Sequence, residues 1–270
     1  MKYPGSKQLM MAKLKRHLQN GDVLVECCTG SASVALNTDF KHYVLNDANL
    51  DLITLYKLVQ SNPEAVIRET KSLFRPETNN ADYYYSIRNA FNLMTDPEER
   101  AVILLYLSRH GYNGLLRYNS SNGFNVPFGN YKTPYHPEPE ILYFAQKLEK
   151  AEFHCMDFVA FINMITKRYE NSGLTLSGYI DPPYLKHDYQ TTVFTEYTAK
   201  GFSYERHVEL DAILTQNRHH FGQVLVSNHD GKLLKETYKG AKRIVRFKVP
   251  RTISAKSKER KPAPEVLLYY

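Results

Sequence analysis

The sequence predicts an α/β fold: a mainly parallel sheet with helices on its faces, interrupted by an inserted segment that is mainly helical. Three observations predict it. Short β-branched runs alternate with amphipathic segments in the first 60 residues. Residues 81–110 then carry two helical patterns with no strand pattern between them. The alternation returns after residue 140. Alternating strand and helix patterns are typical of parallel sheets covered by helices.

The N-terminal segment predicts a βαβα unit. It opens with a helical pattern at 12–18, "AKLKRHL", whose leucines share one face. A β-branched run at 22–26 ends in the small-residue stretch "CCTGSAS" at 27–33, and a second run follows at 42–47. The next helical pattern covers 50–59. Such a unit places its two strands side by side and parallel.

A change of pattern at residues 56–140 predicts an insertion. Helical patterns cover 81–94 and 97–110, and the second begins with an aspartate, a proline and two glutamates, which favour a helix N-terminus. Residues 111–140 are rich in Gly, Asn, Pro and Tyr, and Asn122-Gly123 predicts a hairpin turn. Long irregular stretches are usually functional. The sequence therefore predicts two domains: 1–55 with 141–270, and 56–140.

The C-terminal half returns to the alternating pattern and ends differently. Its predicted elements are, in order, a helix at 139–151, strands at 152–157 and 173–181, a helix at 204–217 and a strand at 222–230. Two further strand patterns, 242–249 and 265–270, flank a basic loop with no helix between them. This ending predicts an antiparallel pair.

Composition narrows the class of protein. The net charge of +7 and the pI of about 9.1 favour a polyanionic partner, although a merely basic soluble protein fits the charge equally well. The three cysteines, Cys27, Cys28 and Cys155, support neither a disulfide framework nor a zinc site, which fits a reducing compartment. No apolar run approaches the roughly 20 residues that span a bilayer. We therefore expect a cytoplasmic protein with no metal and no membrane contact.

Four candidate functional features lie at predicted strand ends: residues 27–33, Asp47, 181–184 and 227–230. Ligands of open α/β sheets bind beyond the carboxyl ends of the strands. The loop at 27–33 would let a ligand approach its backbone, but it has neither G-x-G-x-x-G nor a phosphate-loop Gly-Lys-Ser/Thr. A plain tight turn explains it equally well. Asp47 fits either an acceptor for ribose hydroxyls or the N-cap of the next helix.

The stretch "DPPY" at 181–184 is the most informative of the four. A residue before proline is held extended, and proline has no N–H to donate to a helix. The Pro182 carbonyl and the Asp181 carboxylate can therefore both accept hydrogen bonds from one amino group, beside the flat ring of Tyr184. Two acceptors would localise the lone pair of an aromatic amine toward an electrophile. A strand terminator with a surface tyrosine is the alternative interpretation.

With these motifs in order, the sequence resembles the Dam-type family of DNA adenine methylases that act on GATC, over nearly the whole chain. The matching segments are "KYPGSK" (2–7), "VECCTGSASVALNTDF" (25–40), "LNDANLDLITLYKLV" (45–59), "RHGYNGLLRYN" (109–119), "FNVPFGNYK" (124–132), "DPPY" (181–184), "VSNHD" (226–230) and "RTIS" (251–254). The resemblance implies a Rossmann-like methyltransferase sheet with a DNA-recognition domain and hairpin at 56–140.

The resemblance also implies roles for individual residues. S-adenosylmethionine would be the cofactor, bound by Tyr3, Lys7, Cys28, Gly30, Asp47 and Asp181. The catalytic residues would be Asp181, Pro182, Pro183 and Tyr184. DNA-contacting positions are Lys2 and Tyr131 at the first base pair, Arg109 at a phosphate, Tyr112 and Asn113 where the adenine leaves the stack, and Leu115, Arg117, Asn119 and Pro127 at the bases. Cys28 stands where the family has a phenylalanine, and Ala32 where it has a glycine.

The predicted function is therefore site-specific adenine-N6 methylation of double-stranded DNA, with the adenine flipped out of the stack. The predicted location is the cytoplasm, in association with the nucleoid. Two alternatives stay open: a catalytically weak or dead methylase that only binds DNA, and an amino-methyltransferase with a different recognition sequence. The oligomeric state is not predicted.

Overall fold

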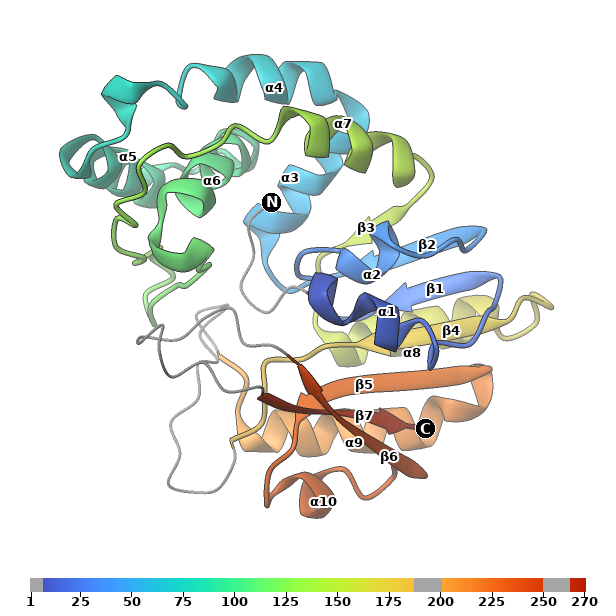
Figure 1. The fold of residues 1–270 in the computed structure, drawn as a ribbon. Helices are drawn as coiled ribbons and strands as arrows, with labels where there is room; N and C mark the ends of the chain where they lie inside the picture. The colour runs from blue at the N-terminus through green and yellow to red at the C-terminus, as the bar shows by residue number, and fades with distance from the viewer. Residues whose placement is uncertain (1–6, 187–200, 250–262) are drawn as a thin grey trace. The chain divides into compact units, whose positions relative to one another are not determined.

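The computed structural model of the chain describes residues 7–186, 201–249 and 263–270 (Figure 1). Lys2 and Tyr3, with the matching segment at 251–254, lie outside the described residues. The chain forms two compact units. The helical unit is Asn49–Cys155, and the described residues of the sheet unit lie in 7–48, 156–186, 201–249 and 263–270. The predicted insertion, 56–140, falls inside the helical unit; the DNA-recognition role assigned to it stays a prediction.

The sheet confirms the predicted α/β class. Within the described residues, its seven strands run in the order β3-β2-β1-β4-β5-β7-β6. Their bounds are β1 Val23–Glu26, β2 His42–Asn46, β3 Glu152–His154, β4 Leu176–Ile180, β5 Gln223–His229, β6 Arg243–Val249 and β7 Ala263–Tyr269. Strands β2, β1, β4 and β5 are parallel neighbours, and β7 pairs antiparallel with both β5 and β6, as the C-terminal pattern predicts.

The strand order places a topological switch point between β1 and β4. From β1 the chain continues to β2, and it later returns to β4 on the other side of β1. In register, Val23 lies opposite His42 on one side and Leu176 on the other. Connections that leave a strand pair in opposite directions open a crevice at the carboxyl ends of the two strands. The segments that follow these two ends are 27–33 and 181–184.

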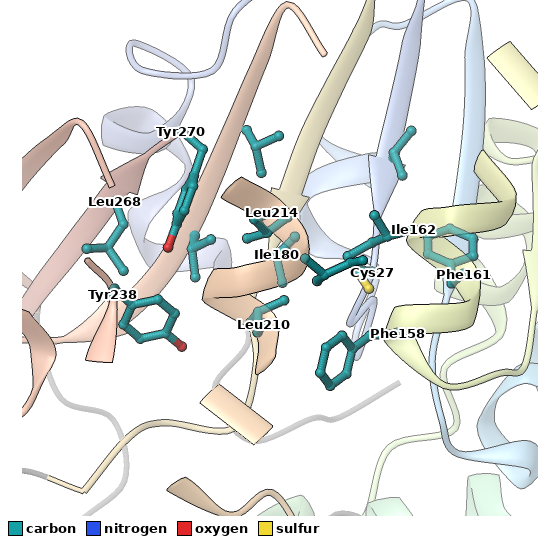
Figure 2. Close-up of a cluster of buried hydrophobic side chains, with 14 of the residues drawn as sticks. Cys27, Phe158, Phe161, Ile162, Ile180, Leu210, Leu214, Tyr238, Leu268 and Tyr270 are labelled. Atoms are coloured by element: carbon teal, nitrogen blue, oxygen red, sulfur yellow. The ribbon is translucent and has the colours of Figure 1, made fainter. Parts of the chain in front are cut away.

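One face of the sheet packs on helices α8 (Phe158–Tyr169), α9 (Tyr204–Asn217) and α10 (Leu234–Thr237). Figure 2 shows Ile180 and Leu268 from the strands with Phe161 and Ile162 of α8 and Leu214 of α9 in this apolar cluster. No element is predicted at 158–169 from the sequence. Helix α8 forms there because Asp157 caps it, accepting the N–H of Val159 at 2.9 Å, and because apolar residues recur at helical spacing.

The opposite face of the sheet carries buried polar side chains. Strand residues alternate between faces, so the neighbours of residues in the apolar cluster point the other way. On this basis Glu26 of β1, Tyr179 of β4, Ser227 of β5 and Glu265 of β7 share the second face, and all four are buried. Figure 1 shows α1 (Met11–Leu14) and α2 (Ser33–Leu36) on this side, where the 3₁₀ turn η1 (Lys7–Met10) also begins the described chain.

The helical unit contains five α-helices and two 3₁₀ turns among the residues 49–155, which also include strand β3. They are α3 Leu50–Ser61, α4 Pro63–Lys71, η2 Pro76–Thr78, α5 Ala81–Leu93, α6 Pro97–His110, η3 Tyr112–Gly114 and α7 Glu138–Lys147. A buried ion pair joins α3 to α6: Arg100 donates from Nε and Nη2 to the two oxygens of Asp51, each at 2.8 Å. Tyr118 also donates to Asp51, at 2.8 Å. This network fixes the loop that contains Tyr118 on the helices.

Residues 111–131, called loop 111–131 below, form a narrow hairpin-like loop with two isolated antiparallel bridges, Tyr118 with Phe124 and Gly111 with Phe128. The predicted turn is present: the N–H of Asn119 donates to the carbonyl of Gly123 at 2.9 Å, and Asn122 has a φ of 59°. No longer ribbon forms within this loop. The Asn119 side chain stabilises the turn, because its Oδ1 accepts the N–H groups of Ser121 and Gly123 at 3.1 and 2.8 Å.

Helix α5 anchors loop 111–131 through backbone atoms of the loop. The Tyr84 hydroxyl and Arg88 Nη1 both donate to the carbonyl of Val126, at 3.0 and 3.1 Å. Asn92 donates from Nδ2 to the carbonyl of Phe124 at 3.1 Å and accepts its N–H at 2.8 Å. These bonds hold the loop on the helix without using loop side chains.

No described helix is long and apolar enough to span a bilayer.

Candidate active site

The "DPPY" segment directly follows β4, at the switch point of the sheet. Lys7 of η1 reaches it: Lys7 Nζ lies 2.8 Å from Asp181 Oδ1, and the Lys7 side chain is only 7% exposed against 20% for Asp181. Pro182 is buried, and Pro183 is half-buried. The carbonyl oxygen of the Asn228 side chain accepts the N–H of Leu185 at 3.1 Å, so "VSNHD" holds the backbone after the motif. The structure therefore brings Lys7, Asp181 and Tyr184 together, and their roles in cofactor binding and catalysis stay predictions.

Tyr184 stands between two charged residues. Lys7 Nζ donates to the Tyr184 hydroxyl at 2.7 Å, and the hydroxyl donates to Glu265 Oε2 at 2.7 Å. Lys7 Nζ also lies 4.8 Å from the centroid of the Tyr184 ring. The result is a partly buried chain of contacts, Asp181–Lys7–Tyr184–Glu265, that joins the motif after β4 to η1 and β7.

The pKa values of this chain keep the ammonium and the phenol protonated. Burial alone would lower the pKa of Lys7, but Asp181, Tyr179 and Glu265 raise it above its ordinary value. Burial raises the pKa of Tyr184 well above its usual range, and the charges of Asp181 and Glu265 add to this effect. Burial also raises the pKa of Asp181, against the opposing charge and hydrogen bond of Lys7. Lys7 therefore stabilises the charged form of Asp181 against the effect of burial.

The small-residue loop at 27–33 is held to the end of β2. The N–H of Gly30 donates to Asp47 Oδ2 at 2.9 Å, and the N–H of Thr29 donates to the carbonyl of Asn46 at 2.8 Å. Gly30 and Ala32 have φ values of 49° and 53°, the left-handed region that favours glycine. The loop is thus a left-handed turn that presents backbone rather than bulky side chains at the switch point.

Asp47 is not the cap of the following helix. The N-cap of α3 is Asn49, whose Oδ1 accepts the N–H of Leu52 at 3.0 Å. The helix-cap interpretation of Asp47 is therefore wrong, and its carboxylate faces loop 27–33 instead. Cys28, in the same loop, is half-buried; its hydrogen bond with Cys27, burial and the charges of Asp47 and Asp181 raise the pKa of its thiol well above the usual value. This thiol is a neutral, apolar surface rather than a nucleophile.

Glu26 is a buried carboxyl group with no role predicted from the sequence. It is 1% exposed, and its Oε1 accepts the N–H of Ala35 in α2 at 2.6 Å. Burial raises the pKa of Glu26 to about 8, which the Ala35 hydrogen bond opposes and the charge of Asp181 reinforces. The sequence signal was an acid at the end of the apolar run "DVLVE". Glu26 fixes the two ends of loop 27–33 by joining β1 to α2.

Glu26→Gln should change how stability depends on pH. The folded-state pKa of Glu26 is about 8 against an ordinary 4.5, so the folded state binds its proton more tightly. The stabilisation from this proton is complete below pH 4.5 and is lost as the pH rises to about 8, by roughly 1.4 kcal/mol per pH unit. The advantage of wild type over Glu26→Gln in unfolding free energy should therefore fall across this window. Denaturant titrations at several pH values measure it.

The exposed Glu236→Gln is the matched control for replacing a glutamate by a glutamine. A flat difference between wild type and Glu26→Gln across this window would show that Glu26 ionises normally in the folded protein.

The other sequence-predicted residues that the structure describes lie in loop 111–131 or next to it in the helical unit. Tyr112 is 44% exposed, Pro127 and Asn119 are exposed, and Asn113, Leu115, Arg117 and Tyr131 are half-buried. Tyr131 and Asn113 contact each other, because the Tyr131 hydroxyl accepts the N–H of Asn113 at 2.8 Å. Asn113 has a φ of 54°. Their predicted contacts with DNA stay predictions.

The two arginines predicted to contact DNA have different partners. Arg109, the last arginine of α6, donates from Nε to the carbonyl of Tyr135 at 3.0 Å and lies over that ring. Arg117 donates from Nε to Asn125 Oδ1 at 2.6 Å and from Nη2 to the Asn125 carbonyl at 3.1 Å. Asn125 therefore holds one edge of the Arg117 guanidinium.

The comparisons with known proteins identify the family of the chain. Residues 3–253 match the family model described as D12 class N6 adenine-specific DNA methyltransferase. A DNA adenine methylase of Salmonella typhi is 43% identical over 273 residues, covering 100% of this chain and 94% of its own length. Those of Escherichia coli strain K12 and Vibrio cholerae serotype O1 are 42% and 39% identical, each over 100% of this chain and 94% and 95% of their own lengths. The chain belongs to the D12 class of N6 adenine-specific DNA methyltransferases.

Proposed function

We propose that this protein transfers a methyl group from S-adenosylmethionine to N6 of adenine within GATC sites of double-stranded DNA. The observation that carries the proposal is the position of Asp181, Pro182 and Tyr184 at the switch point of the sheet, with Asp181 held by a buried lysine. Family membership supports the reaction class. The proposal goes beyond the reaction class because it names S-adenosylmethionine as the methyl donor and GATC as the recognition sequence.

The residues beside the switch point fit S-adenosylmethionine. Loop 27–33 turns through two left-handed residues and carries small side chains, so its backbone can approach a nucleoside. Asp47 faces that loop from the end of β2, where an acid accepts ribose hydroxyls in nucleotide-binding α/β folds. When bound, S-adenosylmethionine supplies an electrophilic methyl group on a sulfonium.

The chain's own residues then act on the adenine amine. Asp181 accepts one N6 hydrogen and the Pro182 carbonyl the other, which localises the nitrogen lone pair. The Tyr184 ring gives the flipped base a flat surface, which offsets part of the lost stacking. Asp181 acts as an acceptor and electrostatic stabiliser, because the amine proton becomes acidic only after the methyl group has arrived. Positioning and preorganised charge supply most of the rate.

Recognition of GATC rests on the resemblance of residues 109–131 and on the chemistry of their side chains. Arginine is the usual bidentate partner of guanine, and leucine or proline can contact the thymine methyl group. Arg117, Leu115 and Pro127 provide these groups on loop 111–131. The alternative with a different recognition sequence would keep the same chemistry and change only these contacts.

The direct test uses methyl-labelled S-adenosylmethionine and two plasmids that differ only in the presence of GATC. Label should enter the plasmid with GATC sites, and that plasmid should become resistant to a nuclease that adenine methylation at GATC blocks. Label in both plasmids would favour another recognition sequence. DNA binding without label in either would favour the dead-methylase alternative.

Asp47→Ala should mainly weaken cofactor binding. The substitution removes an acceptor for ribose hydroxyls and also the partner of the Gly30 N–H, so the cofactor dissociation constant should rise by about 10-fold or more. Calorimetric titration with S-adenosylhomocysteine measures it directly. Asp39→Ala, which removes an exposed acid from the loop before β2, is the control. An unchanged constant in Asp47→Ala would assign Asp47 to loop geometry alone.

A further inference from the structure

Glu265 is the one member of the Asp181–Lys7–Tyr184–Glu265 chain that no motif selects. It lies on β7, an antiparallel strand that enters the sheet beside β5, and it is buried at 9% exposure. Its position on the polar face follows from the alternation of β7, whose Val266 and Leu268 belong to the apolar cluster on the other face. Buried acids almost always have a specific partner, and the partner here is the Tyr184 hydroxyl at 2.7 Å.

The direction of the hydrogen bonds gives Glu265 a definite role. A phenol has one proton to donate. Because Tyr184 donates it to Glu265, the oxygen lone pairs of the phenol face Lys7, which donates to them at 2.7 Å. High pKa values of Lys7 and Tyr184 keep both protons in place. Glu265 therefore fixes the rotation of the hydroxyl and, through it, the position of the ring.

A second consequence concerns Lys7. Lys7 Nζ is shared between Asp181 at 2.8 Å and Tyr184 at 2.7 Å. If the Tyr184 hydroxyl lost Glu265 as its acceptor, Glu265 would no longer fix the direction of its proton, and the hydroxyl could rotate and move away from Lys7. Lys7 would then be bound to Asp181 alone, and the distance between the Asp181 carboxylate and the Tyr184 ring would no longer be fixed. In the proposed reaction both groups contact the same adenine: the Asp181 carboxylate contacts its edge, and the Tyr184 ring contacts its face.

We propose that Glu265 is a positioning residue for methyl transfer: it accepts the proton of Tyr184 and thereby holds the Tyr184 ring at the distance from Asp181 that the flipped adenine requires. This inference rests on the proposed function, in which Tyr184 stacks on the target base. Glu265 itself touches neither substrate nor cofactor in this role.

Two substitutions distinguish the effect of side-chain length from the effect of charge at position 265. Glu265→Asp keeps the negative charge opposite Lys7 but shortens the side chain by one methylene, so the carboxylate no longer reaches the phenol. Glu265→Gln keeps the reach and an acceptor oxygen but removes the charge. The single-turnover methylation rate should fall about 10-fold in Glu265→Asp, a typical loss for one positioning hydrogen bond, and Glu265→Gln should recover most of it. Calorimetric affinity for S-adenosylhomocysteine should change less than about two-fold in both.

A double-mutant cycle with Tyr184→Phe tests whether Glu265 acts through the hydroxyl. Tyr184→Phe keeps the ring and removes the partner of Glu265. If the inference is correct, Glu265→Asp costs nothing further in the Tyr184→Phe background. Three outcomes would each overturn the inference. The rate losses of Glu265→Asp and Tyr184→Phe could multiply in the double variant. Glu265→Gln could lose as much rate as Glu265→Asp, or Glu265→Asp could lose none. Glu236→Gln, which removes an exposed glutamate of the sheet unit, is the control and should match wild type.

A spectroscopic measurement keeps the inference separate from the proposed function. The protein is labelled with ¹³C at the ζ carbon of tyrosine, whose chemical shift reports hydrogen bonding of the hydroxyl, and the Tyr184 resonance is assigned by its absence in Tyr184→Phe. Glu265→Asp should shift that resonance and Glu236→Gln should not, whether or not the wild type methylates GATC. An unmoved Tyr184 resonance in Glu265→Asp would overturn the inference. Absence of methylation by wild type with a moved resonance would overturn only the proposed function.

Discussion

Asp181→Ala should lower the methyl-transfer rate by at least about a hundred-fold to a thousand-fold, the usual loss when one preorganised electrostatic contact is removed from a reaction centre. In the structure Asp181 is the carboxylate at the end of β4, and Lys7 holds it at 2.8 Å. No other acid follows directly from β4 in this position. The rate of a single turnover, measured with labelled S-adenosylmethionine at saturating DNA, reports the chemical step without product release.

Two measurements show whether the loss is chemical. DNA binding by Asp181→Ala should stay within about three-fold of wild type, because the substitution lies in the sheet unit and not in loop 111–131. The variant leaves Lys7 buried without this carboxylate, which costs stability. Asp181→Asn retains the shape and one acceptor and serves as the variant with the smaller structural change. A folded Asp181→Ala that turns over at near the wild-type rate would rule out the proposed role of Asp181.

Arg117→Ala should relax selectivity at one guanine of the recognition sequence. Asn125 binds the Nε edge of the Arg117 guanidinium, so the group is oriented before DNA arrives. A bidentate arginine–guanine pair contributes about 1–3 kcal/mol of discrimination, which corresponds to a loss of roughly 5- to 150-fold in preference. The measurement compares methylation rates on GATC and on a substrate changed at that base pair, for wild type and variant, at fixed salt.

Arg117→Lys is the matched control, because lysine keeps the charge and loses the planar fork. If Arg117 reads a base, the lysine variant should lose preference nearly as much as alanine does. If Arg117 instead contacts a phosphate, lysine should restore the rate, and the alanine variant should weaken all sequences about equally. That outcome would move sequence reading to other residues of loop 111–131.

Local pattern was enough to predict most elements of the fold. The strands were found because apolar, β-branched runs end in turn residues, as in Val23–Glu26 and Leu176–Ile180. Pattern does not predict helices α4 and α8, although Asn62 with Pro63, and Asp157 with the apolar residues that follow it, carry helix-start signals. The order of the strands could not be read from pattern, because it depends on where each crossover returns to the sheet.

The same limit applies to the candidate site. Motifs and resemblance identified Asp181 and Tyr184, but Glu265 is 81 positions from Tyr184 and Lys7 is 177 positions from it. Such contacts follow only from the strand order. Glu26 could have been found locally, since an acid that ends a fully apolar strand must be buried or capped. Whether Asp47 capped a helix could not be decided from sequence, because Asn49 is an equally good cap two residues later.

If loop 111–131 recognises DNA as proposed, its attachment to α5 bears on how readily target preference can diversify. Tyr84, Arg88 and Asn92 bind the carbonyls of Val126 and Phe124 and the N–H of Phe124, which are groups that nearly every amino acid carries. Substitutions of other loop side chains, such as Leu115 and Pro127, therefore leave these hydrogen bonds between α5 and the loop intact. If loop 111–131 reads DNA as proposed, point mutations at these two positions should alter the target preference while the loop stays folded, and a library randomised at both is a suitable starting pool for selecting altered specificity.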